Sequence, residues 1–285
     1  MLIKARVDIK KPDIKDLLKK DFTLVDMHFH SRYSDGINKI PNILKRARKL
    51  GIGIAITDHN EIKGSMESAK HKDILTIPGT ELTTFEGIHL LAYFYKSSDL
   101  SHFYNKHIVC RKKSNLFCLD IGISDILDRL EDYNAITCAA HPFAIFWTGL
   151  CKVYHEPKIT EETHKRIDAI EVINGSNMKS RNRMALDFAE KNKKSITAGT
   201  DGHTLHEMGN VLTYTKFPAT SSQFLDSIKD ETNFIVGKET FIIRKAAAHS
   251  VKFKPTRTTA LKSYAVKTAD YMNIKRKNFL NKKRL

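Results

Sequence analysis

Side chains that can bind metal ions recur just after, or at the end of, short apolar runs of the sequence. In chain order they are Asp26, His28, His30, Asp35, Asp58, His59, Glu81, His89, His141, Asp201 and His203. In parallel α/β folds the carboxyl ends of the strands share one face, where residues far apart in sequence converge. Imidazole binds ions such as Zn, Fe and Mn, and a carboxylate can bridge two ions. The joint pattern therefore predicts a polynuclear metal site on one rim of the fold.

The spacing of His28 and His30 has its own geometric meaning. Residues i and i+2 of a strand point to the same side, so both imidazoles can bind one ion. Asp26 has the same phase, and we expect it either to bind the ion or to orient one of the histidines. A single H-x-H pair is common by chance, and a lone histidine such as His89 is more often an ordinary core or surface residue. The prediction therefore depends on several strand ends together.

Elements that would position these residues alternate along the chain. Amphipathic segments predict helices over residues 40–50, 123–133 and 178–193, and Pro41 and Gly51 suit the start and the end of the first. Short apolar runs predict strands near residues 22–25, 51–57, 74–77, 88–94, 135–140, 169–173 and 195–198. Repeated strand–helix alternation favours a parallel sheet or barrel.

The charge of the 285-residue chain is unevenly distributed. Apolar residues make up 41% of the sequence, which excludes a wholly disordered chain. Of the net charge of +16, residues 236–285 carry +12, from 14 basic and 2 acidic residues, so the rest carries only +4. A basic tail suggests an anionic partner such as nucleic acid, an acidic membrane surface or a polyanionic substrate. The alternative is that the lysines and arginines only keep the tail solvated.

The cysteines and the amino-terminal segment indicate in which cellular compartment the protein is expected. The four cysteines include no C-x-x-C pair, so a zinc knuckle or redox motif is not indicated. Few cysteines, no apolar signal-peptide stretch and no run of about 18 apolar residues favour a cytoplasmic protein without a transmembrane segment.

Seven short motifs together resemble the PHP (polymerase and histidinol phosphatase) family of metal-dependent phosphoesterases. They appear in the family's order as VDMHFHSRYSDG (25–36), ITDHN (56–60), PGTEL (78–82), HLLAYF (89–94), AHPF (140–143), IEVIN (170–174) and AGTDGH (198–203). The resemblance implies an α/β fold, a distorted (β/α)7 barrel with two or three metal ions at the carboxyl ends of its strands.

The resemblance also implies a ligand set. Carried over motif by motif, the metal ligands are His28, His30, Asp35, His59, Glu81, His89, His141, Asp201 and His203. Glu81 would bridge two ions. Family members vary at the positions of Asp35 and His89, and ligand-competent side chains at both favour three ions over two. Asp58 and Glu171 are expected to support the ligands rather than to bind an ion, and the ions are expected to be Mn, Fe or Zn.

Other residues are candidates for handling the substrate. Closely spaced divalent ions acidify a bound water, which can then attack a phosphate ester. The general acid that protonates the leaving group is expected to be His203, if it is not metal-bound, or His206. Arg181 or Arg183 is a candidate for gripping a second phosphate or a carboxylate. The alternative for both arginines is a solvated helix start.

The chain is expected to comprise a phosphoesterase domain over residues 1–245 and a basic extension over residues 246–285. Residues 96–119 and 143–166 break the strand–helix rhythm and are expected to be insertions or lids. The first of them interleaves basic and aromatic residues, which could stack bases and hold phosphates. The more ordinary interpretation is a pair of helices covering the barrel. Phe146 and Trp147 suit either a lid or a packed loop.

These features predict an enzyme, a metal-dependent phosphoric ester hydrolase. The expected substrate is a nucleotide or short nucleic acid, cut as by a phosphatase or a 5′-to-3′ exonuclease, with contact to nucleic acid through the basic tail. One alternative is a small-metabolite phosphatase of the histidinol-phosphatase type, and another is a metal-dependent hydrolase of a different bond, such as an amide. A non-catalytic nucleic-acid-binding module is a third alternative, but such a module has no need of nine convergent ligands.

Overall fold

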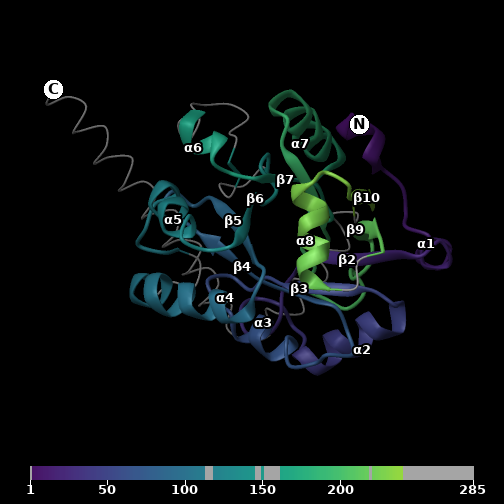
Figure 1. Ribbon diagram of the computed structural model, residues 1–285, viewed down its shortest axis with the longest axis horizontal. Coiled ribbons are helices and arrows are strands. Elements are labelled where there is room, and N and C mark those ends of the chain that lie inside the picture. The colour runs from purple at the N-terminus through teal and green to yellow at the C-terminus, as the bar shows by residue number, and fades with distance from the viewer. Residues whose placement is uncertain (1, 113–117, 145–148, 151–160, 218–219, 240–285) are drawn as a thin grey trace, which may run out of the picture. The chain divides into compact units, whose positions relative to one another are not determined.

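The structure is a computed structural model, and it describes residues 2–112, 118–144, 149–150, 161–217 and 220–239. These residues belong to one compact unit built on a mixed sheet, in the order β1-β10-β9-β2-β3-β4-β5-β6-β7-β8 (Figure 1). The strands are β1 (Val7–Asp8), β2 (Phe22–Phe29), β3 (Gly53–Ile56), β4 (Thr76–Thr83), β5 (His89–Phe94), β6 (Ala135–Ala139), β7 (Ala169–Asn174), β8 (Ser195–Gly199), β9 (Val211–Lys216) and β10 (Phe234–Gly237). The helices are α1 (Ile14–Lys19), α2 (Ile40–Leu50), α3 (Lys63–Ser68), α4 (Ser97–Phe103), α5 (Ile123–Leu130), α6 (Glu161–Lys165), α7 (Lys179–Asn192) and α8 (Ser221–Lys229).

Seven consecutive strands, β2 to β8, curl so that the end of β8 returns to β2. The parallel bridge of Phe29 with Gly202 marks this closure, where His30 N–H donates to the carbonyl of Gly202 at 2.9 Å. Thr200 N–H adds a hydrogen bond of 2.9 Å to Asp26 Oδ1. The predicted α/β fold, a curled sheet of seven strands with its polar site at one rim, is confirmed.

Strand β5 runs opposite to its neighbours β4 and β6, which strand–helix alternation alone did not predict. The connection from β4 to β5 spans only Thr84–Ile88. A parallel crossover needs a dozen or more residues, so this short connection can only make an antiparallel pair. The reversal places the first residue of β5, His89, at the edge where the parallel strands end.

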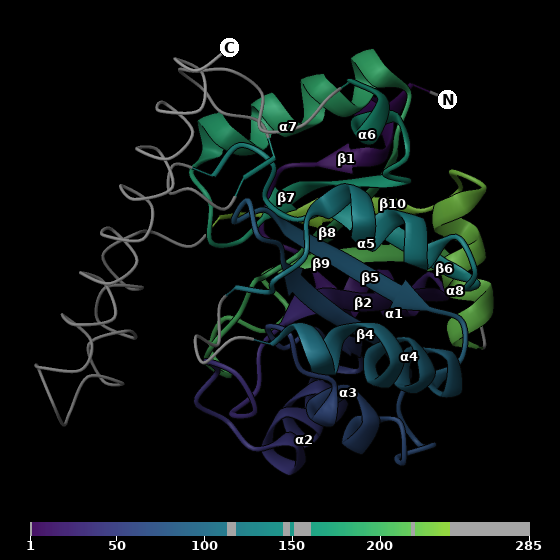
Figure 2. The ribbon, with the colours of Figure 1, turned by 90° about the vertical axis from the view of Figure 1, so that its left-hand side faces the viewer.

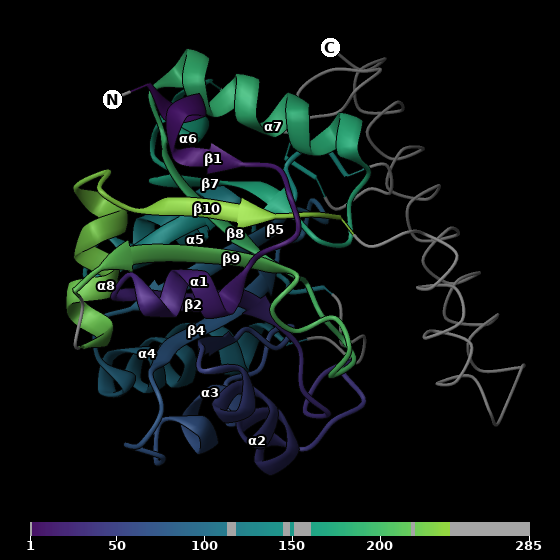
Figure 3. The same cartoon turned by 90° about the vertical axis from the view of Figure 1, so that its right-hand side faces the viewer.

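Three further strands extend the sheet beyond β2. The first half of β2 pairs antiparallel with β9, which pairs antiparallel with β10, and β10 pairs parallel with β1 (Figure 3). Strand β2 therefore contacts β9 through Phe22–Val25 and the chain after β8 through its other half. The sequence patterns did not indicate β1, β9, β10 or α8.

Helices cover the sheet, and the ends of α2 show how local sequence sets where a helix begins and ends. Helix α2 spans the predicted residues 40–50: Pro41 lies in its first turn, and Gly51 ends it with a φ of 71°, a conformation natural to glycine. Its buried face, Ile40, Ile43, Leu44 and Ala47, packs into the core. Figures 1 and 2 show α2, α3 and α4 side by side, while α7 packs along β7.

The described part of the 96–119 segment is helical. Helix α4 continues through a π-helical turn (Tyr104–Ile108), and Phe103, Tyr104 and Ile108 are buried in the core. Their burial favours the covering-helix interpretation over base stacking. Residues 113–117, Phe146, Trp147 and the extension over residues 246–285 lie outside the described residues. Among the described helices, none is long and apolar enough to cross a membrane.

Candidate metal centre

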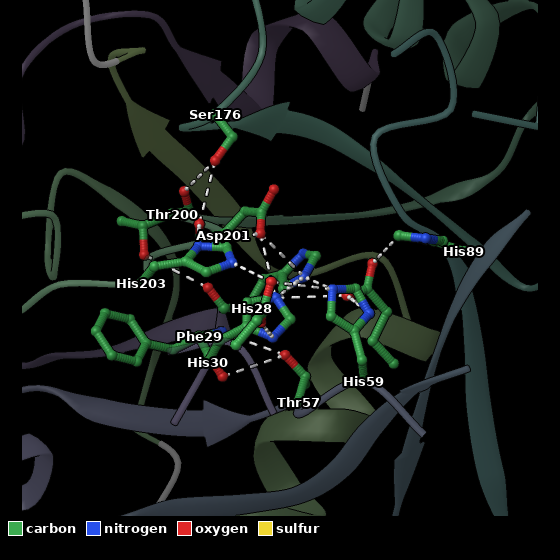
Figure 4. Close-up of polar contacts among 12 residues, drawn as sticks. His28, Phe29, His30, Thr57, His59, His89, Ser176, Thr200, Asp201 and His203 are labelled. Carbon is green, nitrogen blue, oxygen red and sulfur yellow. Dashed lines mark hydrogen bonds and ion pairs between the residues drawn. The ribbon is translucent and has the colours of Figure 1, made fainter. Parts of the chain in front are cut away.

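The nine proposed ligands gather at the edge of the sheet where the parallel strands end. Figure 4 shows His28, His30, His59, His89, Asp201 and His203 among them. His28, Glu81 and His89 lie within β2, β4 and β5, and the other six lie in the connections after β2, β3, β6 and β8. Six of the nine are buried, whereas Asp35, Asp201 and His203 are partly exposed. The cluster is therefore open to solvent on the side of these three residues.

Four overlapping groups of these side chains bring ligand atoms within 4.8 Å of one another. They are His28–His30–Asp201, His30–His59–Glu81, His30–Asp35–His203 and Glu81–His89–His141. All nine residues occur in these groups, and His30 belongs to three of them. The arrangement has room for more than one ion, with ligands shared between neighbouring positions.

Glu81 lies between two of the groups. Its Oε2 lies 3.0 Å from His59 Nδ1 and 3.4 Å from His28 Nε2 and His30 Nε2, and its Oε1 lies 2.8 Å from His89 Nδ1 and 3.3 Å from His141 Nε2. Burial alone would raise the pKa of this carboxyl, but the surrounding imidazoles lower it well below its usual range. Glu81 is therefore a fixed negative charge with one oxygen on each side.

His28 and His30 face each other, as their spacing in the strand predicts. Their Nε2 atoms are 3.1 Å apart, and Asp201 Oδ1 lies 3.6 Å from the first and 3.2 Å from the second. The other nitrogen of His28, Nδ1, lies 2.9 Å from Glu171 Oε1. Burial lowers the pKa of His28, but the carboxylates of Glu171, Glu81 and Asp201 together raise it well above its ordinary value.

His203 is oriented by the backbone of its own loop. Its Nδ1 lies 2.9 Å from the carbonyl oxygen of Asp201, which can only accept a hydrogen bond. The ring must therefore donate Nδ1–H, and its Nε2 faces Asp35 Oδ2 at 3.0 Å. His203 belongs to the group His30–Asp35–His203, which fits a ligand role, and its roles as a metal ligand or as a general acid both stay predictions.

The buried donor set fits divalent cations. Among the described residues, Glu81 Oε2 and His30 Nδ1 are buried and form no hydrogen bond. Orphaned buried polar atoms are costly in a protein interior unless an ion or a water satisfies them. Imidazole nitrogens and carboxylate oxygens facing one another are the donors that Zn, Mn and Fe accept.

Three residues of the site have positive φ angles that side-chain-bearing residues rarely adopt. They are Asn60 (50°), His141 (28°) and Asp201 (49°), which follow β3, β6 and β8. Such conformations cost about 1–3 kcal/mol each and persist when surrounding contacts enforce them. Asn60 N–H donates to the carbonyl of Glu81 at 2.8 Å, and His141 N–H donates to Glu171 Oε2 at 2.7 Å. The strain therefore lies in the backbone that aims the ligands.

Carboxylates behind the ligands hold their loops, as expected for Asp58. Asp58 accepts hydrogen bonds from the backbone and hydroxyl of Ser31 at 2.7 and 2.6 Å and from the hydroxyl of Ser34 at 2.6 Å. Asp26 accepts from the backbone and hydroxyl of Thr200, which favours the orienting role over direct binding. Burial raises the pKa of Asp26 to about 7.

His206 lies outside the four groups, and Arg181 is not of a type that binds metal ions. The side chain of His206 is exposed, and Arg181 is half-buried in the first turn of α7, where its guanidinium lies 3.6 Å from Met184 Sδ. Among the described residues, neither belongs to the four groups. Their roles toward a substrate stay predictions.

Asn174 is a site residue that sequence reasoning did not single out. Its amide Nδ2 donates to Glu171 Oε2 at 2.8 Å and lies 3.4 Å from Asp201 Oδ2, so it connects two parts of the site. The available signal was its place in the IEVIN motif, three residues after Glu171.

Solved structures with related folds include nucleases. PfuEndoQ, a lesion-specific endonuclease from Pyrococcus furiosus, matches with a TM-score of 0.59 and 18% identity over 75% of this chain and 57% of that chain. A two-domain Bacteroides vulgatus protein, named for a predicted PHP-like metal-dependent phosphoesterase, matches with a TM-score of 0.57 and 15% identity over 81% of this chain and 68% of that chain. At these identities the likeness concerns the fold.

Two proteins of Methanocaldococcus jannaschii are similar in sequence. Uncharacterized protein MJ0417 is 26% identical over 270 residues, which cover 89% of this chain and 98% of that protein. Uncharacterized protein MJ1587 is 38% identical over 77 residues, so the match covers only 45% of its length and 22% of this chain. The PHP domain model matches residues 26–236, from Asp26 in β2 to Val236 in β10. This chain therefore belongs to the PHP domain family.

Proposed function

We propose that this protein is a metal-dependent phosphoesterase that hydrolyses phosphate esters of nucleotides or short nucleic acids. The observation that carries the proposal is the set of nine clustered ligands, with a buried glutamate between two groups of imidazoles. Membership of the PHP family supports the reaction class. Among structural neighbours, one is an Endonuclease Q complex with a 27-mer duplex substrate, which has a TM-score of 0.60 and supports including nucleic acid among the test substrates.

The residues divide into those that would hold ions and those that aim them. The nine ligands of the four groups would hold two or three divalent ions, of which Mn, Fe and Zn suit the donors. When bound, such ions supply a nucleophilic water at neutral pH and neutralise charge on the phosphate oxygens. Glu81 stays ionised between the two sides, and Asp26, Asp58 and Glu171 hold the loops that carry the ligands.

The open side of the cluster is where a substrate would enter. Asp35, Asp201 and His203 are the partly exposed members, with 25%, 15% and 14% of their side chains accessible. A phosphate approaching there would meet ligands contributed by the connections after β2 and β8. We assign no general acid to His203 while its Nε2 faces Asp35, and Arg181 stays a candidate for a second phosphate of the substrate.

A substrate screen with added metal tests the proposal. Purified protein loaded with Mn²⁺ would be incubated with nucleoside mono- and bisphosphates, 5′-phosphorylated short RNA, histidinol phosphate and a simple amide. We expect phosphate or nucleotide release from a nucleotide or RNA, and its loss after dialysis against a chelator. The matched control is Asp201→Asn, which removes one ligand charge and keeps the side-chain shape.

The outcomes separate the alternatives. Release from histidinol phosphate alone would favour a small-metabolite phosphatase, and cleavage of the amide alone would favour a different hydrolase. If protein with bound Mn²⁺ binds RNA but hydrolyses no ester or amide, the binding-module alternative holds and the phosphoesterase proposal fails.

A further inference from the structure

Glu171 joins two ligands that come from different strands. Its carboxylate is fully buried, and its Oε1 lies 2.9 Å from His28 Nδ1. Its Oε2 accepts hydrogen bonds from the backbone N–H of His141 at 2.7 Å and from Asn174 Nδ2 at 2.8 Å. Each oxygen therefore has its own partners.

The partners of Oε2 cannot exchange donor and acceptor roles. A backbone N–H only donates, which fixes the direction of the hydrogen bond from His141. The amide of Asn174 is also fixed, because its Oδ1 accepts the backbone N–H of Ser176 at 2.8 Å, so its NH₂ group must face Glu171. The atom at the Oε2 position must accordingly be an acceptor.

The fixed acceptor position at Oε2 bears on His28 through the other oxygen of Glu171, Oε1. A neutral imidazole carries one N–H and one lone pair, and a carboxylate can only accept. In the neutral ring, which is the form that binds a metal ion, Oε1 therefore holds the proton of His28 on Nδ1 and leaves the lone pair on Nε2. That nitrogen is the one that faces His30 Nε2 at 3.1 Å and Glu81 Oε2 at 3.4 Å.

We propose that Glu171 is a positioning residue that holds His28 in the tautomer with Nδ1–H and thereby makes Nε2 available to a metal ion. The two backbone N–H groups of His141 and Ser176 set the direction of the whole hydrogen-bond chain. This proposal rests on the metal-dependent function proposed above, and it assigns Glu171 no contact with substrate.

The variant Glu171→Gln tests the tautomer with almost no change of shape. The glutamine oxygen must take the Oε2 position, because two donors point there, so its NH₂ group is directed at His28 Nδ1. That nitrogen must then carry a lone pair, and the proton moves to Nε2, which can no longer bind an ion. We expect at least one fewer Mn²⁺ ion per chain than in the wild type at equal free Mn²⁺, and roughly 10–100-fold weaker binding at that position.

A matched control makes the same chemical change next to the other end of the same strand. Asp168 directly precedes β7, and its Oδ2 accepts the N–H and hydroxyl of Thr137 at 2.8 and 2.7 Å. Asp168→Asn loses the same charge but keeps an acceptor for Thr137, so we expect wild-type metal content. Elemental analysis after equilibrium dialysis measures both variants. A Glu171→Gln protein with the wild-type number and affinity of ions would overturn the proposal.

A direct spectroscopic readout on the wild type does not depend on whether Glu171→Gln folds. In wild-type protein loaded with Zn²⁺ and labelled with ¹⁵N-histidine, we expect the His28 ring proton on Nδ1, with the signal assigned by its absence in His28→Gln. In Glu171→Gln we expect that proton on Nε2. A wild-type spectrum with Nε2–H on His28 would refute the proposal by itself.

Neither readout uses hydrolysis. A wild-type protein that binds ions but cleaves no ester would therefore contradict the proposed function and leave the role of Glu171 to be decided by the metal content and the spectrum. An active protein in which His28 carries its proton on Nε2 would support the proposed function and contradict the role proposed for Glu171.

Discussion

The carboxylate of Glu81 is the residue on which the two sides of the cluster depend. Its two oxygens face different imidazoles, with His59 on one side and His89 and His141 on the other. We predict that Glu81→Ala loses at least two ions per chain, because both sides lose a ligand and the neutralising charge. His203→Ala should lose one ion at most, because His203 belongs to a single group. Hydrolysis should fall by a factor of about 100 or more in Glu81→Ala.

Equilibrium dialysis followed by elemental analysis gives the number of ions, and the thermal unfolding of the metal-free proteins shows whether the fold is kept. Equal ion loss in Glu81→Ala and His203→Ala would contradict the prediction that both sides of the cluster depend on Glu81. Glu81→Gln is the companion variant, since it keeps the shape but removes the charge and replaces one acceptor oxygen with an NH₂ group.

At the residue scale, the strand-end pattern predicted that these side chains converge, and they do so in four groups, but it did not predict all the connections among them. The pairing of His28 with His30 follows from the two-residue period of a strand, and the structure places them as expected. The hydrogen bond that His28 Nδ1–H donates to Glu171 Oε1 joins β2 to β7, and no local pattern shows which strands meet. The role of Thr200 escaped notice for the same reason, because it binds Asp26, a residue of β2 far away in the sequence. Asn174 contacts Glu171 within β7 and Asp201 after β8, and only the first of these contacts is local.

The return of β8 to β2 is the element-level feature that completes the cluster. Gly199, the last residue of β8, lies so close to β2 that a Cβ there would be 2.4 Å from His28 Cβ and 2.5 Å from His28 N. We predict that Gly199→Ala forces the two strands apart and separates Asp201 from His28. The expected result is destabilisation by roughly 1–3 kcal/mol and loss of metal binding.

The control for this prediction is Gly122→Ala at the start of α5. The added Cβ would meet only the flexible carboxylate of Glu86, at 2.7 Å. We expect this variant to lose helix stability, since Gly suits an N-cap better than Ala, but its metal content should match the wild type. Wild-type metal content in Gly199→Ala would show that the site tolerates a wider gap between β2 and β8.

The elements with strong local signals were predictable, and those fixed by strand pairing were not. Helix α2 and strands β2 to β8 follow hydrophobic periodicity, with glycine and proline marking the ends of elements. The reversed direction of β5 depends on the length of its connection. Strands β9 and β10 gain their stability from pairing, β9 with β2 and β10 with β9 and β1. Short strands of this kind carry little signal of their own, because tertiary pairing decides their state.

At the scale of the whole molecule, the basic extension is the feature that distinguishes substrate classes. Residues 251–285 contain 11 basic residues and one acidic residue. If the extension captures nucleic acid, removing it should weaken RNA binding much more at low salt than at high salt, because counterion release drives such binding. Hydrolysis of a mononucleotide should stay unchanged, since all nine proposed ligands lie before residue 204.

The test compares the full chain with two variants, a deletion of residues 251–285 and a full-length variant with glutamine at positions 275–277 and 282–284. The second keeps the length and removes six positive charges. For single-stranded RNA each phosphate contact contributes about 0.7 to the slope of log affinity against log salt, so losing six contacts lowers the slope by at most about 4. Binding measured by fluorescence anisotropy at several salt concentrations gives the slope. Identical slopes for all three proteins would leave the extension without this role and favour a small phosphorylated metabolite as the substrate.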